Sequence, residues 1–275
     1  MRVRIIVLRR RRLIRFGLLV FLLALALVPW SLPGSGFRED EGGRATTAPP
    51  GPSGTVGAIS SKAPVVIDPG HGGIDWGSYH GEILEKDINL DLAKRVVGIL
   101  RRRGIPVELT REEDMHLSLR HHRIDIGNRI DIALSSGAWA LISLHVNYAE
   151  VEYAKGTLIL YQEWSAESRR IGEIIQAELK ALQPDKKNDI DPEGELYMFT
   201  ESPIPTVIVE VGFLSNPEDR ELLMKDEFRE KMAGTLARGI EKARKEFLLR
   251  EDTGAPEPRS RNPLRRFRPK LPWQP

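Results

Sequence analysis

The chain has 275 residues, of which 29% are charged and 41% hydrophobic, and its net charge at neutral pH is only +2. This balance is typical of a soluble globular body with appendages, and it gives no basic footprint for nucleic-acid binding. Cysteine is absent. Disulfides, thiolate nucleophiles and thiolate metal ligands are therefore excluded, so a bound metal would need histidine and carboxylate ligands.

The first 30 residues predict export. Seven arginines lie within residues 1–15, and an uncharged run rich in Leu, Val and Ala follows from Phe16 to Trp30. A basic segment before a short apolar run is an export signal, and it places the following chain outside the cytoplasm. We predict either a cleaved signal peptide or an N-terminal membrane anchor over residues 1–30, and a location across the cytoplasmic membrane, in the cell envelope.

The remaining chain divides by composition. Residues 31–63 are rich in Gly, Pro, Thr and Ser without periodicity, which predicts a disordered linker. Residues 251–275 are rich in Pro and Arg and predict a basic, disordered tail. The folded domain is therefore assigned to residues 64–250.

Within this domain, short apolar runs predict strands and helical spacing predicts helices. The predicted strands span residues 65–67, 106–110, 140–145, 156–161, 196–199 and 206–211. The predicted helices span residues 85–103, 118–137 (capped by Ser118), 165–179, a short stretch from 217, and 228–249, with a loop at 186–194. This alternation predicts a single α/β domain with a central, mostly parallel or mixed sheet of about six strands, covered by helices on both faces.

Three of these strands lead into side chains that bind metals or move protons. His71 follows the first strand across Gly70, His145 ends the strand at 140–145, and Glu210 lies in the last strand. In open α/β sheets, ligands bind at this carboxyl edge. Alone, a histidine placed like His71 is more often a surface or hydrogen-bonding residue than a ligand, and a structural role explains His145 equally well. Glu210 interrupts an apolar run, where a carboxylate is costly unless it is paired or bound.

A fourth candidate, Glu85, begins the helix at 85–103. An acid there also suits the positive end of the helix dipole without any function, and Asp87 could serve equally. Two imidazoles and one carboxylate could hold a catalytic Zn²⁺ with an open position for water, while a second carboxylate moves protons. That chemistry is a hydrolase's. Asp68 is expected to orient the loop or its histidine, and Asp75 is a rival carboxylate close to His71.

Four motifs, taken in order, resemble the zinc-dependent N-acetylmuramoyl-L-alanine amidases, the amidase-3 family, over residues 65–247. The motifs are Asp68-Pro69-Gly70-His71-Gly72-Gly73, Leu84-Glu85-Lys86-Asp87-Ile88-Asn89-Leu90, Ser143-Leu144-His145-Val146-Asn147 and Val209-Glu210-Val211-Gly212-Phe213-Leu214-Ser215-Asn216. The resemblance implies that His71, Glu85 and His145 are zinc ligands and that Glu210 is the catalytic glutamate. Structural or substrate-contact roles are implied for Asp68, Arg111, Arg129 and Asn147.

The resemblance also implies an activity. The expected reaction cleaves the amide between the lactyl group of N-acetylmuramic acid and L-alanine of the stem peptide of peptidoglycan. The chain looks most like the germination-specific, spore-cortex amidases of the CwlD type, in which a muramic acid deacetylase acts next to form muramic-δ-lactam. An activating partner protein is a further expectation. The alternatives are a vegetative cell-wall amidase, a zinc peptidase on the same type of fold, and a non-catalytic wall-binding pseudo-enzyme.

Overall fold

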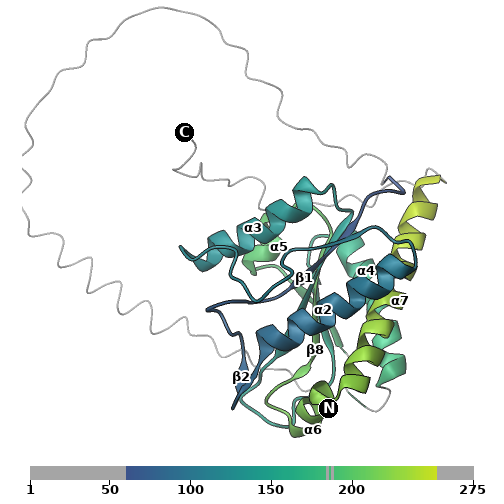
Figure 1. Ribbon diagram of the computed structural model, residues 1–275. Coiled ribbons are helices and arrows are strands. Elements are labelled where there is room, and N and C mark those ends of the chain that lie inside the picture. The colour runs from purple at the N-terminus through teal and green to yellow at the C-terminus, as the bar shows by residue number, and fades with distance from the viewer. Residues whose placement is uncertain (1–59, 184–185, 187–188, 253–275) are drawn as a thin grey trace, which may run out of the picture. The chain divides into compact units, whose positions relative to one another are not determined.

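The computed structural model describes residues 60–183, 186 and 189–252 (Figure 1). A six-stranded sheet lies at its centre, in the spatial order β4-β1-β5-β8-β6-β7. The strands are β1 (Val65–Pro69), β4 (Val107–Leu109), β5 (Ala140–Asn147), β6 (Leu158–Gln162), β7 (Asp189–Glu193) and β8 (Thr206–Phe213). The first four in spatial order are parallel, β6 runs antiparallel to β8, and β7 is parallel to β6. The prediction of a mixed, mostly parallel sheet is confirmed.

Helices cover both faces of this sheet (Figure 1). One face carries α2 (Glu85–Arg102), α4 (Ala166–Leu182) and α7 (Asp226–Asp252), and the other carries α3 (His122–Ser135) and α5 (Tyr197–Glu201). The short α6 (Pro217–Met224) follows β8. A small antiparallel hairpin, β2 (Tyr79–His80) with β3 (Ile83–Leu84), leads directly into α2.

The strand pattern divides the core between the two faces. Along β1, Val65 and Ile67 pack into the larger core beneath α2, α4 and α7, whereas Val66 packs into the smaller core with Phe199 of α5. Successive side chains of a strand point to opposite faces, so an unbroken apolar run marks a strand that is buried on both sides. Both cores hold the parallel strands in place, and the carboxyl ends of β1, β5 and β8 meet at one edge.

Three local predictions were wrong. Residues 196–199 form no strand: Leu196 is the N-cap of α5 and residues 197–199 belong to that helix. A four-residue apolar run does not distinguish a strand from a helix. The predicted loop at 186–194 contains β7, an edge strand whose polar sequence pairs with β6 through its backbone. The cap of α3 is His121, whose side chain accepts a hydrogen bond from the amide of Arg123, and not Ser118.

The predicted signal or anchor at 1–30, most of the linker and nearly all of the tail lie outside the described residues. Among residues 60–183, 186 and 189–252, no helix has the length and apolar character needed to cross a membrane.

Candidate metal centre and catalytic site

The loop after β1 brings two histidines together. The Gly70 amide donates to the Leu144 carbonyl of β5 (3.0 Å), which keeps the loop beside that strand. A Cβ atom at Gly70 would lie 2.2 Å from Nε2 of His145, so only glycine allows this approach. The next residue, His71, has a φ of 61°, a left-handed conformation that is uncommon outside glycine and that occurs often at functional sites.

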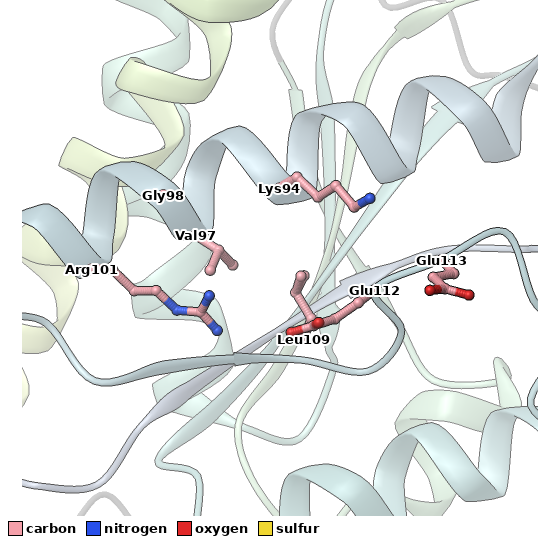
Figure 2. A pocket seen from close by; sticks show the side chains of 7 residues that line it. All are labelled: Lys94, Val97, Gly98, Arg101, Leu109, Glu112 and Glu113. Atoms are coloured by element: carbon pink, nitrogen blue, oxygen red, sulfur yellow. The ribbon is translucent and has the colours of Figure 1, made fainter.

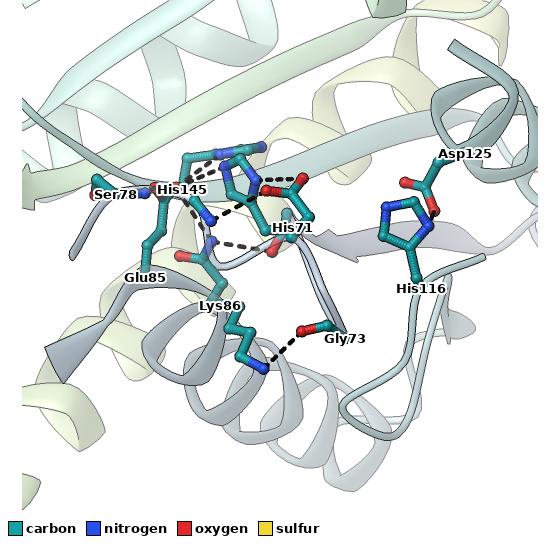
Figure 3. Close-up of polar contacts among 12 residues, drawn as sticks. His71, Gly73, Ser78, Glu85, Lys86, His116, Asp125 and His145 are labelled. Atoms are coloured by element: carbon teal, nitrogen blue, oxygen red, sulfur yellow. Dashed lines mark hydrogen bonds and ion pairs between the residues drawn. The ribbon is translucent and has the colours of Figure 1, made fainter. Parts of the chain in front are cut away.

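His71, Glu85 and His145 form one cluster (Figure 3). Oε1 of Glu85, the first residue of α2, lies 2.9 Å from Nδ1 of His145 and 3.3 Å from Nε2 of His71. The two imidazole rings meet edge to face with their centroids 4.8 Å apart. Potential ligand atoms of the three residues all lie within 4.8 Å of one another. The structure thus brings together the three side chains that the resemblance implies as zinc ligands.

Surrounding groups fix the orientation of the cluster. Oδ2 of Asp75 lies 2.8 Å from Nδ1 of His71, which leaves Nε2 facing Glu85. The Glu85 carboxylate accepts hydrogen bonds from the backbone amides of Ser78 (2.7 Å) and Val146 (3.0 Å). Burial opposes the charged imidazolium, but the bonds to Asp75 and Glu85 outweigh it and raise the pKa of His71 to about 10.

Glu210 lies beside this cluster without joining it. Glu210 of β8 is paired in register with His145 of β5. The residue is half-buried, but Oε2 is fully buried and has no hydrogen-bond partner among the described residues. Burial raises the pKa of Glu210 to about 7; the histidines oppose this shift and the charge of Glu85 adds to it. A carboxyl group with this pKa can take up and release a proton near neutral pH.

Asp68 supports the loop and does not contact His71. Its fully buried carboxylate accepts hydrogen bonds from Oγ1 of Thr110 (2.5 Å), Oγ of Ser143 (2.6 Å) and Nη1 of Arg129 (2.7 Å). The histidine-orienting carboxylate is Asp75 instead. Of the two roles expected for Asp68, the contacts are those of a loop-orienting residue.

Two buried arginines hold the same loop in place through hydrogen bonds to its carbonyl groups. Arg129 donates to the carbonyls of Pro69 and His71, both at 2.9 Å. Arg111 donates to the carbonyls of Pro69 (2.9 Å) and Gly70 (3.2 Å). Neither guanidinium is placed for substrate contact, because both are almost fully buried. Their contacts are those of structural residues, the first of the two expected roles.

Among the other residues near the site, the sequence predicted a role for some and missed one. Asn147 is half-buried two residues beyond His145, and its Oδ1 accepts a hydrogen bond from the Tyr148 amide (2.7 Å). The sequence predicted no role for Lys86. Its ammonium group is buried and donates to the Gly73 carbonyl (2.8 Å) and to Asp114 (2.6 Å). Asp87, the rival of Glu85, is exposed and lies outside the cluster.

An open groove of about 440 Å³ lies elsewhere, between α2 and the segment after β4 (Figure 2). It is lined by Lys94, Val97, Gly98, Arg101, Leu109, Glu112 and Glu113. None of the four site residues lines this groove, so the groove is separate from the candidate metal centre and catalytic site.

Known proteins are similar to this chain in both sequence and fold. Residues 65–242 match the amidase-3 family, described as N-acetylmuramoyl-L-alanine amidase. The chain is 32% identical to the germination-specific N-acetylmuramoyl-L-alanine amidase of Bacillus subtilis over 183 residues, which cover 64% of this chain and 77% of that protein. It is 29% identical to the amidase AmiA of Escherichia coli over 224 residues, covering 65% and 75% of the two chains.

Solved structures give the same result. The CwlD amidase of Clostridioides difficile, solved in complex with the GerS lipoprotein, superposes with a TM-score of 0.63 at 30% identity, covering 67% of this chain and 99% of that one. An N-acetylmuramoyl-L-alanine amidase of Nostoc punctiforme gives a TM-score of 0.60 at 32% identity, covering 67% and 98%. With the family model spanning most of the folded residues, the chain belongs to the amidase-3 family of N-acetylmuramoyl-L-alanine amidases.

Proposed function

We propose that this protein is a zinc-dependent amidase that cleaves the bond between the lactyl group of N-acetylmuramic acid and L-alanine of the peptidoglycan stem peptide. The observation that carries this proposal is the Glu210 carboxyl group, whose buried Oε2 has no hydrogen-bond partner within the described part of the chain and which lies beside a cluster of two histidines and a glutamate. Membership of the family supports the substrate. The geometry supports hydrolysis.

The cluster fits Zn²⁺ by the chemistry of its donors. Two imidazole nitrogens and one carboxylate oxygen are a known catalytic zinc set, which keeps one position open. Asp75 on Nδ1 of His71 reproduces the carboxylate–histidine arrangement that orients zinc-binding imidazoles. We assign His71, Glu85 and His145 as the ligands. When bound, Zn²⁺ would polarise the amide carbonyl and lower the pKa of a water molecule.

Glu210 would carry the proton through the reaction. Its carboxylate accepts a proton from water as the water oxygen forms a bond to the amide carbon. It then delivers that proton to the alanine nitrogen as the carbon–nitrogen bond breaks. One water is consumed, and the products are a lactyl carboxylic acid and a peptide with a free amino terminus. Without a metal, burial raises the pKa of Glu210 to about 7; a bound cation would favour the charged carboxylate, which is the form that accepts the proton from water.

The deciding experiment joins metal analysis to a digest. The full-length protein is purified, its zinc is counted, and it is incubated with peptidoglycan with and without a chelator. Mass spectrometry then searches for peptides that begin at L-alanine. Release that the chelator stops supports both the reaction and the metal. Bound zinc with no release from any peptidoglycan, even with envelope extract present, would contradict the proposed reaction, and release that resists the chelator would contradict the metal.

Glu85 gives a sharper test of the ligand set. Glu85→Ala should lower zinc affinity sharply, because the carboxylate that lies between the two histidines is removed. Asp87→Ala is the matched control, since this acid lies two residues further along α2 and is exposed. Zinc titration of both variants decides the matter. Equal affinity of Glu85→Ala and the parent protein would remove Glu85 from the ligand set.

For the biological setting we propose spore cortex maturation. The similarity to a germination-specific amidase and to CwlD supports this role. The relatives also include AmiA, so vegetative wall turnover is the alternative. Parallel digests of cortex and vegetative peptidoglycan separate the two: preference for cortex supports the first role, and preference for vegetative wall supports the second. A deacetylase acting on the stripped muramic acid would follow in the cortex.

Two further proposals concern delivery and assembly. We propose that residues 1–30 direct export or anchor the chain, which would place residues 64–250 outside the cytoplasmic membrane. We also propose an activating partner protein, supported by the solved complex of CwlD with the GerS lipoprotein. Fractionation of cells that produce the full-length chain tests the first, and amidase activity with and without envelope extract tests the second.

A further inference from the structure

Two exposed aromatic residues lie on the loop between His71 and Glu85. Trp76 is 53% exposed and Tyr79 is 60% exposed, although large aromatic side chains gain most from burial. Their rings meet edge to face with centroids 6.3 Å apart. Such a contact covers at most one face of one ring, so the other ring faces remain available to a ligand.

The loop that carries the two rings is pinned to the start of α2. The first amides of a helix have no partner within the helix. Here the amide of Glu85 donates to the Ser78 carbonyl (2.9 Å) and the amide of Lys86 donates to the Trp76 carbonyl (3.2 Å). Tyr79 pairs with Leu84 in the β2–β3 hairpin. The aromatic pair is therefore held in place before any ligand arrives, which lowers the entropy cost of binding.

The same loop touches the candidate metal ligands. A Cβ atom at Gly77, the residue after Trp76, would lie 2.5 Å from Oε2 of Glu85 and 2.6 Å from Cδ2 of His71. In addition, Oγ of Ser78 donates to the Val146 carbonyl at the end of β5 (3.0 Å). The loop that carries the two rings therefore borders the candidate metal centre.

We infer that Trp76 and Tyr79 form a sugar-stacking platform that binds the glycan strand of the substrate next to the scissile amide. This inference rests on the proposed amidase function. The scissile amide hangs from a pyranose ring through a short lactyl group, so one sugar must lie beside the cluster. The C–H face of a pyranose is apolar and flat and suits an aromatic ring. A peptide is recognised more readily through its backbone amides and charges.

The test measures binding of glycan strands from which all stem peptides have been removed. Calorimetry with the full-length protein should show binding, and Trp76→Ala and Tyr79→Ala should each weaken it roughly 5- to 10-fold, as expected for the loss of one aromatic contact. Trp76→Phe should retain most of the affinity, whereas Trp76→Leu should not. This contrast separates stacking from general apolar contact. Zinc content and thermal unfolding show whether each variant is folded.

Tyr153→Ala is the matched control. Tyr153 is 78% exposed on the loop between β5 and β6 and is not part of the β2–β3 hairpin, and its loss should leave glycan affinity unchanged. Loss of affinity in this variant but not in Trp76→Ala would move the glycan to the other loop and overturn the inference. Binding to phospholipid vesicles that depends on Trp76, without glycan binding, would also overturn it.

The outcome is independent of the amidase assay. Peptide-free glycan contains no scissile amide, so its binding reports only on the platform. If the parent protein releases stem peptides but does not bind peptide-free glycan, the platform is wrong and the proposed function stands. If it binds glycan but releases no peptides even with envelope extract present, the proposed function fails and the platform remains.

Discussion

Asp68 and Glu210 are two carboxylates in the same sheet, and their pKa values are shifted in opposite directions. Asp68, in β1, is fully buried and accepts hydrogen bonds from Thr110, Ser143 and Arg129. Burial alone would raise its pKa, but the Arg129 charge and these bonds outweigh burial and hold the pKa of Asp68 below its ordinary value. In β8, Oε2 of Glu210 has no such partner among the described residues, and burial raises the pKa of this group to about 7.

The difference shows that partners, and not burial alone, decide what an enclosed carboxylate does. A fully bonded carboxylate stays charged and holds backbone in place, as Asp68 does through Arg129. A carboxylate without partners sits near its protonation midpoint at neutral pH and is suited to proton transfer. The first stabilises the loop that delivers His71, and the second faces the cluster that this loop completes.

The largest expected effect comes from Glu210→Gln. We expect stem-peptide release to fall by about 10²- to 10⁴-fold, the usual contribution of a general acid–base group, because an amide cannot accept the proton. Zinc content should not change, since Glu210 lies off the ligand set. Thermal stability should stay equal or rise, because a poorly satisfied acid is replaced by a neutral group. Mass spectrometry, metal analysis and thermal unfolding measure the three quantities.

Glu108→Gln is the matched control for this variant. Glu108 is an exposed carboxylate on the edge strand β4 of the same sheet, and its loss should leave release, zinc and stability unchanged. Loss of zinc together with turnover in Glu210→Gln would show that Glu210 is a metal ligand.

The next effect concerns the other member of the comparison. Asp68→Asn should lower the free energy of unfolding by about 3 kcal/mol, the lower end of the range for a broken buried ion pair, because Arg129 keeps its second partner Asp125. Denaturant unfolding measures this loss. Thr110→Val removes only one of the hydrogen bonds to Asp68 and should cost about 1 kcal/mol. Equal stability of Asp68→Asn and the parent protein would contradict the supporting role.

The strand-end residues could be predicted from the sequence for a physical reason. His145 and Glu210 lie in long apolar runs, and parallel strands bring their carboxyl ends to one edge of the sheet. Local pattern thus fixes position in space when a residue belongs to a regular element. Glu85 was less determined, because an acid at a helix start has an ordinary explanation, and it was assigned through the family motif.

The partners of these residues could not be predicted in the same way. Asp75 reaches His71 because the loop turns through a left-handed residue, and loop sequences carry no period that reveals such a turn. Arg129 reaches Asp68 across 61 positions of sequence, and only the packing of α3 against β1 and β5 brings them together. The functional groups follow from secondary structure, whereas their supports follow from tertiary packing.

Asp75→Asn tests whether support by a partner also tunes the cluster. We expect zinc affinity to fall about 10- to 100-fold, because the carboxylate that orients the His71 ring becomes a neutral amide. Glu82→Gln, on the exposed turn of the β2–β3 hairpin, is the control and should bind zinc like the parent protein. Competition with a coloured chelator measures both affinities. Equal affinities for Asp75→Asn and Glu82→Gln would contradict the orienting role.

The smallest effect is a pH dependence of opposite sign for the two carboxylates. The pKa of Asp68 is lower in the folded protein than in the unfolded chain, so its contribution is complete above about pH 4 and is lost as the pH falls further. The stability difference between the parent protein and Asp68→Asn should therefore be constant from pH 7 to 5 and shrink towards pH 3. Urea unfolding at each pH measures it, and a difference that grows on acidification would contradict the charge assignment.

Glu210 should show the reverse dependence in a different range. Its pKa is about 7 in the folded protein against 4.5 ordinarily, so ionisation costs more in the folded state. The parent protein should therefore lose stability relative to Glu210→Gln as the pH rises from about 4.5 to 7. This unfolding is measured with a chelator present, because a bound cation favours the charged carboxylate. The stability differences of the parent protein from Asp68→Asn and from Glu210→Gln could instead change in the same direction with pH. The two carboxylates would then share one electrostatic environment, and the assignment of one to structural support and the other to proton transfer would be wrong.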